Sequence, residues 1–182
     1  MTFAIVAGLL YLISKDGAAV KATGSNIFTA FDALFQKYAK QNGLDWKMLK
    51  AIAMNESGLG VAANGLEASV ARGLANPNDV EGSKSSDGKS WGLMQVTVTT
   101  AKDFDSSATP QKLNDPEYSI RIAAEFIAWL TKQFPTSEPR YTEWVVKSYN
   151  QGRGNSAKER RGEIAGYAGV YWDRYLRNYA KI

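Results

Sequence analysis

Two predicted helices open the folded part of the chain. Apolar residues recur every three or four positions over residues 27–38, which predicts an amphipathic helix with Asn26 as its N-cap and Gly43 just past its end. Asp45 is a suitable N-cap for a second helix, whose apolar positions lead directly to Glu56. We therefore expect two consecutive helices joined by a short turn.

The C-terminal half shows the same helical spacing. Asp115 followed by Pro116 is typical of a helix start, and one apolar face continues from there until Pro135. Further helices are predicted at about residues 142–149 and, rich in aromatic side chains, at about residues 163–179. The fold is predicted to be mainly α.

Regular periodicity fails between residues 58 and 89, where Gly, Ser, Asn and Asp become frequent. This predicts a long irregular loop, and loops of that length in a compact domain are more often functional than not. Strand-like alternation is limited to about residues 95–99.

The N-terminal segment differs from the rest of the chain, because residues 2–13 are uncharged and largely apolar. As a helix they would reach roughly 18 Å, short of the roughly 30 Å of a bilayer core. We expect an apolar helix over residues 2–20 that anchors the protein to a membrane or docks on a partner, with a signal-like leader or a buried helix as alternatives. The predicted division is residues 1–24 as anchor and linker and residues 25–182 as the folded domain.

Composition narrows the chemistry. The 182 residues include 22 Lys and Arg against 18 Asp and Glu, and this net charge of +4 suits an approach to anionic polymers such as cell wall, nucleic acid or a lipid surface. There is no cysteine and no histidine, which excludes thiolate zinc sites and Ser-His or Cys-His catalysis. Acid–base chemistry must therefore use carboxylates, lysine or tyrosine, and no cofactor or metal is indicated. No clustered basic helix indicates a nucleic-acid partner.

Glu56 is the candidate acid. It follows Leu49 and Ile52 at steps of three and four, so it lies on the core-facing side of its helix. Desolvation there would disfavour the charged form and raise the pKa of the carboxyl group. The alternative is a glutamate in the last helical turn that simply faces water.

Two more short motifs follow Glu56 in the sequence. The sequence Gly-Leu-Met-Gln at 92–95 offers a tight turn and an amide, and Tyr149 and Asn150 offer a ring and an amide at a helix end. Each also has an ordinary structural interpretation, as a turn followed by core residues, or as a core tyrosine with an Asn C-cap.

Together, Glu-Ser at 56–57, Gly-Leu-Met-Gln at 92–95 and Ser-Tyr-Asn-Gln-Gly at 148–152 resemble, in this order, the soluble lytic transglycosylase family. The resemblance extends over about residues 27–179 and is loosest in the loop at 58–89. It implies a lysozyme-like α-helical fold and a substrate made of peptidoglycan glycan strands.

The resemblance also implies roles for individual residues. Glu56 would protonate the glycosidic oxygen between N-acetylmuramic acid and N-acetylglucosamine, then accept the proton of the muramyl 6-hydroxyl to give a 1,6-anhydro product. A tyrosine near the C-terminus, Tyr167 or Tyr171, would hydrogen-bond the acid. The cleft would be lined by Ser57, Met94, Gln95, Tyr149 and Asn150.

The chain departs from the family pattern in two places. Ser148 stands where the family usually has alanine, and the interval of 36 positions from Glu56 to Gly92 is longer than usual. Within that interval Asp87 lies in a stretch similar to goose-type lysozymes, which makes it a candidate second carboxylate for inverting hydrolysis, with Asp79 or Glu81 as further candidates. The alternative interpretation of Asp87 is a turn residue with a solvated charge.

The context that fits a short apolar leader on a minimal domain is a phage particle that opens the cell wall locally, or a bacterial envelope or periplasmic enzyme. A non-catalytic virion or envelope structural protein with the same fold is the third alternative, although an intact Glu56 argues against it.

Overall fold

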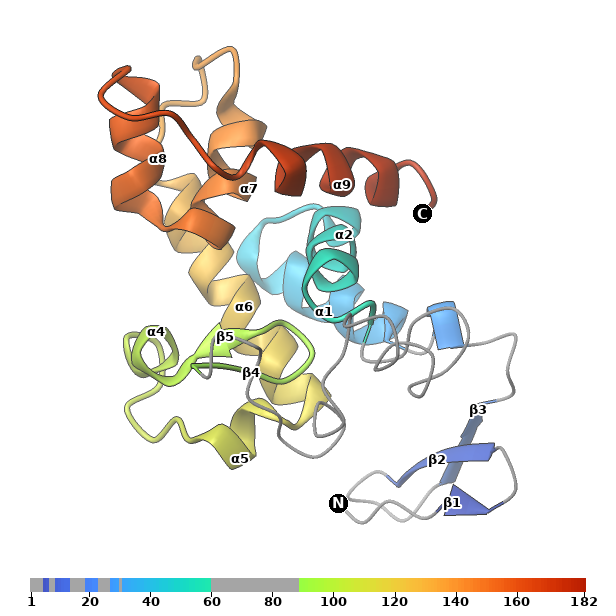
Figure 1. Ribbon diagram of the computed structural model, residues 1–182. Coiled ribbons are helices and arrows are strands. Elements are labelled where there is room, and N and C mark those ends of the chain that lie inside the picture. The colour runs from blue at the N-terminus through green and yellow to red at the C-terminus, as the bar shows by residue number, and fades with distance from the viewer. Residues whose placement is uncertain (1–4, 7–8, 14–18, 23–26, 30, 60–88) are drawn as a thin grey trace.

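The computed structural model describes the chain in six stretches (Figure 1). They are residues 5–6, 9–13, 19–22, 27–29, 31–59 and 89–182.

Helices dominate these stretches, as predicted. Besides the short 3-10 helix η1 (Ile27–Thr29), they are α1 (Asp32–Asn42), α2 (Trp46–Glu56), α4 (Val98–Lys102), α5 (Pro110–Leu113), α6 (Pro116–Thr131), α7 (Tyr141–Gln151), α8 (Arg153–Arg160) and α9 (Gly169–Tyr179). Strands β4 (Ser90–Trp91) and β5 (Val96–Thr97) pair as an antiparallel hairpin.

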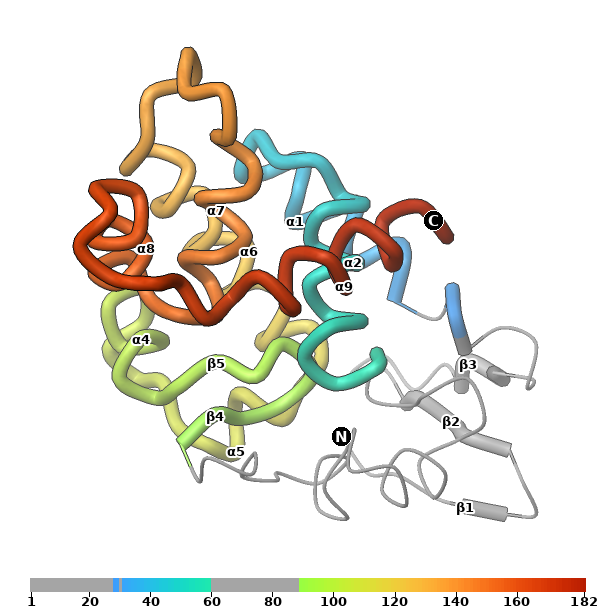
Figure 2. The backbone as a smooth tube through the Cα atoms, turned by 45° about the horizontal axis from the view of Figure 1, so that its top comes forward, coloured from blue at the N-terminus to red at the C-terminus, as the bar shows by residue number. Residues whose placement is uncertain are grey.

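Helix α6 is at the centre of the domain. It packs against α1, α2, α4, α5 and α7, and Figures 1 and 2 show it passing between the N-terminal helices and α7. Ile120, Ile127 and Leu130 on this helix are completely buried. Burial of each such side chain contributes about 1.5–3 kcal/mol, so α6 is the main hydrophobic support of the surrounding helices.

The predicted helix starts at the two aspartates are confirmed. The Asp45 carboxylate accepts a hydrogen bond from the Lys47 amide, and the Asp115 carboxylate accepts one from the Tyr118 amide. Gly43 ends α1 with a left-handed backbone, at φ 66°. These ends follow from local side-chain chemistry, which is why they could be read from the sequence.

Other predicted helix boundaries were wrong. Helix α1 begins at Asp32 and not at residue 27, because η1 precedes it as a separate turn. Helix α9 begins at Gly169 and not at residue 163, since the preceding segment turns at Gly162 with φ 74°. Helix α8 was missed because its sequence, RGNSAKER, has almost no apolar residues to reveal a helical period.

The predicted N-terminal apolar helix is also wrong. Strands β1 (Ile5–Val6), β2 (Leu9–Ile13) and β3 (Ala19–Ala22) pair antiparallel in the order β1-β2-β3. Short apolar runs rich in Ile, Val, Leu and Tyr carry no period that separates helix from strand, and their β propensity prevails here. No helix in the described stretches has the length and apolar character needed to span a bilayer. The division at residues 24 and 25 stays a prediction.

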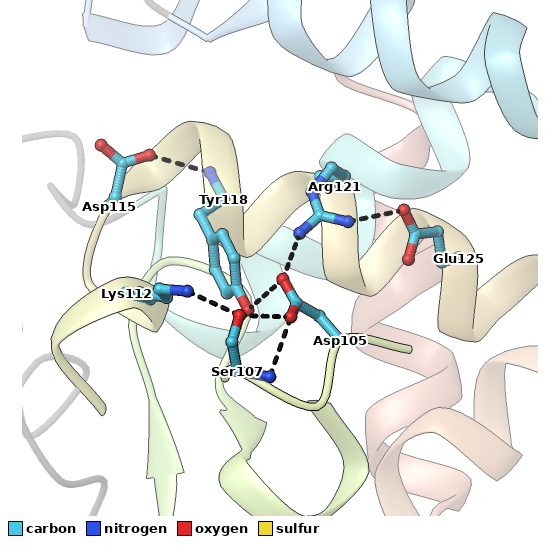
Figure 3. Close-up of polar contacts among 7 residues, drawn as sticks. All are labelled: Asp105, Ser107, Lys112, Asp115, Tyr118, Arg121 and Glu125. Atoms are coloured by element: carbon cyan, nitrogen blue, oxygen red, sulfur yellow. Dashed lines mark hydrogen bonds and ion pairs between the residues drawn. The ribbon is translucent and has the colours of Figure 1, made fainter. Parts of the chain in front are cut away.

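A polar cluster fastens the segment after α4 to the central helix (Figure 3). The Asp105 carboxylate accepts hydrogen bonds from the Tyr118 hydroxyl and the Arg121 guanidinium, both at 3.0 Å. Hydrogen bonds from the Ser107 side chain and amide, followed by that from Tyr118, hold the pKa of Asp105 well below its usual 3.8. The cluster thus sets the position of α4 against α6 while Asp105 is ionised.

Gly92 makes the tightest backbone contact of the hairpin. Its φ is 73°, and a Cβ atom placed there would lie 1.8 Å from the Leu113 carbonyl oxygen. Only glycine allows both the left-handed backbone and this approach to the end of α5. The position of the turn at 92–95 against α5 and α6 therefore requires glycine at residue 92.

We predict that Gly92→Ala lowers the free energy of unfolding by about 2–4 kcal/mol, because it combines left-handed strain with a backbone clash. Gly43→Ala is the matched control, since Gly43 has φ 66° but nothing within 4 Å of its would-be Cβ atom. It should cost only about 1 kcal/mol. Urea denaturation of both variants measures the difference, and equal losses would contradict the steric argument.

Candidate active site

Glu56 is the last residue of α2 and is half-buried. Helix α9 packs against α2, as both views show (Figures 1 and 2). From α9 the Tyr171 hydroxyl donates a hydrogen bond of 2.6 Å to Oε1 of Glu56. The acid therefore lies at a contact between two helices and not in a frayed end exposed to water.

Two buried asparagines hold α9 in register with α2. The Asn55 side-chain amide donates to the Tyr171 carbonyl oxygen at 3.0 Å, and the Asn178 amide donates to the Asn55 side-chain oxygen at 2.9 Å. Asn55 and Asn178 are each 8% exposed. Because unpaired buried amides are costly, these bonds favour one placement of Tyr171 relative to Glu56.

Gln151 fixes the start of α9 from the other side. Its side-chain oxygen accepts a hydrogen bond from the Ala168 amide at 3.2 Å, and its nitrogen donates to Glu159 at 2.6 Å. Glu159 in turn pairs with the nearly buried Lys147. This network joins α7, α8 and the first residue before α9.

The turn at 92–95 lies beside the acid. The Ser57 hydroxyl, directly after Glu56, donates to the Leu93 carbonyl oxygen at 2.7 Å, and the Met94 amide donates to the Ser119 hydroxyl at 3.1 Å. Ser57 is 1% exposed and Met94 is completely buried. Both side chains are therefore buried, and neither is among the residues that line the cleft, in contrast to the expectation that they line it.

Gln95 and Tyr149 form another part of the cleft wall. Gln95 has φ 49°, uncommon for a residue with a side chain, and its side-chain amide nitrogen donates to the Gly92 carbonyl oxygen at 2.8 Å. The Tyr149 hydroxyl donates to the Met94 carbonyl oxygen at 2.7 Å. The Gly-Leu-Met-Gln turn and the Tyr-Asn helix end, distant in sequence, are thus in direct contact.

These elements enclose a cleft of about 500 Å³. Its lining is Glu56, Ser90, Gln95, Val96, Thr97, Thr100, Phe126, Ser148, Tyr149, Asn150, Gln151 and Gly152. Asn150 is exposed at the rim. The cleft unites an acid with hydroxyls, amides and aromatic rings, which is the mixture of groups that hydrogen-bonds and packs against sugars.

Both tyrosines near the acid remain neutral donors. Burial, and then the charge of Glu56, raises the pKa of Tyr149 and of Tyr171 well above the usual 10.0. For Tyr171 the hydrogen bond to Glu56 acts in the same direction. The Tyr171 hydroxyl therefore keeps its proton throughout the neutral pH range.

The other predicted residues lie elsewhere. Tyr167 precedes α9, is 63% exposed and donates to the Gln151 carbonyl oxygen at 3.1 Å, so it is Tyr171 that bonds Glu56. Asp87, Asp79 and Glu81 lie outside the described residues. Within the described stretches no three His, Cys, Asp or Glu side chains gather in a way that could hold a metal ion.

The sequence reasoning missed Asn55, Gln151 and Phe126. Asn55 carried a usable signal, because an amide beside an acid in an otherwise apolar helix needs a buried partner. Gln151 lies within the motif at 148–152, but neither its role nor that of Phe126 could be assigned from the sequence, since both depend on how α6, α7, α8 and α9 pack.

Comparisons with known proteins agree with this geometry. The family model described as Transglycosylase SLT domain matches residues 33–166. Over 138 residues, 75% of this chain, the chain is 31% identical to membrane-bound lytic murein transglycosylase F of Haemophilus influenzae (strain PittGG). Over 132 residues, 71% of this chain, it is 30% identical to peptidoglycan transglycosylase gp16 of Escherichia phage T7.

The chain spans 23% of the length of the first of these relatives and 8% of the second. A similar share, 23%, holds for the transglycosylase F of Actinobacillus succinogenes, which is 30% identical over 140 residues. The similarity is therefore to one domain of larger proteins. Since the family model covers most of the chain, from α1 to the segment before α9, the chain belongs to the soluble lytic transglycosylase family, through its transglycosylase SLT domain.

Proposed function

We propose that this domain is a lytic transglycosylase that cleaves peptidoglycan glycan strands, with Glu56 as its only acid–base group. The observation that carries the proposal is the Glu56 carboxyl group, half-buried on the wall of a cleft and bonded by Tyr171 at 2.6 Å. The names of the relatives, which refer to murein and peptidoglycan transglycosylases, support the same substrate.

The proposed reaction uses one carboxyl group twice, first as an acid and then as a base. Protonated Glu56 donates to the glycosidic oxygen as the bond from muramyl C1 to that oxygen breaks, and the sugar ring takes up positive charge. The Glu56 carboxylate then accepts the proton of the muramyl 6-hydroxyl as its oxygen bonds to C1. The products are a 1,6-anhydromuramyl end and a free 4-hydroxyl, and Glu56 is protonated again.

Tyr171 is suited to both halves of this cycle. Its hydrogen bond to Oε1 fixes the orientation of the Glu56 carboxyl group. A phenol that donates to a carboxylate also stabilises the charged form, which is the form that accepts the second proton. In the proposed mechanism Gln95, Tyr149 and Asn150 contact the sugars of the bound strand.

The cellular role is proposed on similarity alone. The likeness to the phage T7 protein supports local opening of the cell wall when a phage introduces its genome, and the likeness to membrane-bound enzymes supports action in the bacterial envelope. Contacts of residues 2–20 with a membrane or with virion proteins stay a prediction.

We predict that Glu56→Gln lowers the release of soluble muropeptides from purified sacculi by at least about a hundredfold, because glutamine cannot donate or accept the proton. Glu125→Gln on α6 is the control, since Glu125 is half-buried but pairs with Arg121 outside the cleft. Thermal unfolding should show both variants folded. Activity retained in Glu56→Gln would refute the assignment.

The same digests identify the reaction by mass spectrometry. Anhydromuramyl ends are expected for the transglycosylase. Reducing ends would instead support inverting hydrolysis, which needs a second carboxylate about 6.5–9.5 Å from the first. Absence of any release by the unaltered protein would favour a binding role.

We predict that Tyr171→Phe reduces turnover of sacculi roughly 10- to 100-fold, the scale of one hydrogen bond to a charged group, by freeing the carboxyl group from its fixed orientation. Tyr175→Phe is the matched control, because Tyr175 is buried on the same helix and stacks on Trp172. Initial rates of muropeptide release compare the two. Equal effects of both changes would show that the loss comes from helix packing alone.

A further inference from the structure

A row of aromatic rings extends from the cleft to the protein surface. Tyr149 and Phe126, both of which line the cleft, have ring centroids 5.4 Å apart. One turn further along α6, Trp129 stacks on Phe126 with centroids 6.2 Å apart and an angle of 22° between the planes. The ring of Phe104, just after α4, has its centroid 6.0 Å from that of Phe126.

A second hollow lies along this row. It has a volume of about 260 Å³ and is lined by Asp103, Phe104, Phe126 and Trp129. Phe126 forms part of the wall of both the hollow and the main cleft, so the two adjoin. The Asp105 cluster in Figure 3 holds the segment that carries Asp103 and Phe104 against α6.

The hollow differs from an ordinary packing contact in its exposure and its charged edges. Trp129 is 39% exposed, unusual for so large an apolar ring. The Arg153 guanidinium, from the start of α8, lies over the Trp129 ring at 5.6 Å from its centre, and the exposed Asp103 is one of the residues that line the hollow. An apolar face is therefore flanked by one donor and one acceptor.

This combination matches the surface of a pyranose ring. Such a sugar presents C–H groups on its faces and hydroxyl or acetamido groups around its edge, so an aromatic ring covers the face while charged side chains hydrogen-bond the edge. We propose that Phe104, Phe126 and Trp129 form a distal subsite that binds an N-acetylhexosamine of the same glycan strand, beyond the sugars at Glu56. The proposal rests on the proposed function, because it takes the strand in the main cleft to be a glycan.

The test is calorimetric titration of the full chain, in a Glu56→Gln background that prevents cleavage, with the trimer and the hexamer of β-1,4-linked N-acetylglucosamine. The protein with Trp129 unchanged should bind the hexamer more tightly than the trimer. Trp129→Ala should weaken hexamer binding about tenfold, the scale of one aromatic contact, and so remove most of the gain with length.

Two further variants make the result specific. Trp129→Phe keeps a ring and should retain most of the hexamer affinity. Leu176→Ala removes another exposed apolar side chain, 47% exposed on α9, and should not change the affinity for either oligomer. Equal losses for trimer and hexamer, unchanged hexamer affinity in Trp129→Ala, or no binding of the hexamer by the chain with Trp129 would each overturn the proposal.

Failure of the proposed function would look different. In that case the protein with Glu56 intact would release nothing from sacculi, while the difference in affinity between hexamer and trimer could still be present and still depend on Trp129. The cleavage assay and the binding assay therefore report separately on the two proposals.

Discussion

The hydrogen bond between Tyr171 and Glu56 depends on how closely α2 and α9 are held together. The two residues are 115 positions apart, and a phenol reaches a carboxylate at 2.6 Å only when both helices keep one register. The Asn55 and Asn178 amides supply that register, because any slip of α9 would leave buried polar groups without partners. The position of the acid is thus a consequence of helix packing as much as of its own helix.

The floor of the cleft depends on a different constraint, which is steric. Gly92 lets the hairpin approach the Leu113 carbonyl, and Ser57 and Tyr149 then donate to the carbonyl oxygens of Leu93 and Met94. The main-chain oxygens of this turn are therefore engaged by groups on both sides of it. This explains how a short turn connects the end of α2 with the end of α7.

Local signals in the sequence predicted much of this site. The caps at Asp45 and Asp115, the acid at the end of an apolar helix and the glycine-led turn are each recognisable within a few residues. The choice of Tyr171 over Tyr167 could not be made from local signals, because it depends on where α9 begins. The prediction for the N-terminal strands failed for a related reason, since an apolar run of five residues such as β2 is too short to show a helical or a strand period.

The lining of the cleft bears on how a single carboxyl group can serve as both acid and base. Among its described lining residues only Glu56 and Tyr149 can change charge, and burial keeps the pKa of Tyr149 well above 10.0. The remaining polar contacts come from amides and hydroxyls, which do not titrate in this range. Protonation of Glu56 therefore changes the charge of the cleft lining but leaves the hydrogen-bond donors of the other lining residues unchanged. The hydrogen bonds that hold a sugar can stay the same while the acid gives up its proton and takes another, as a one-carboxylate cycle requires.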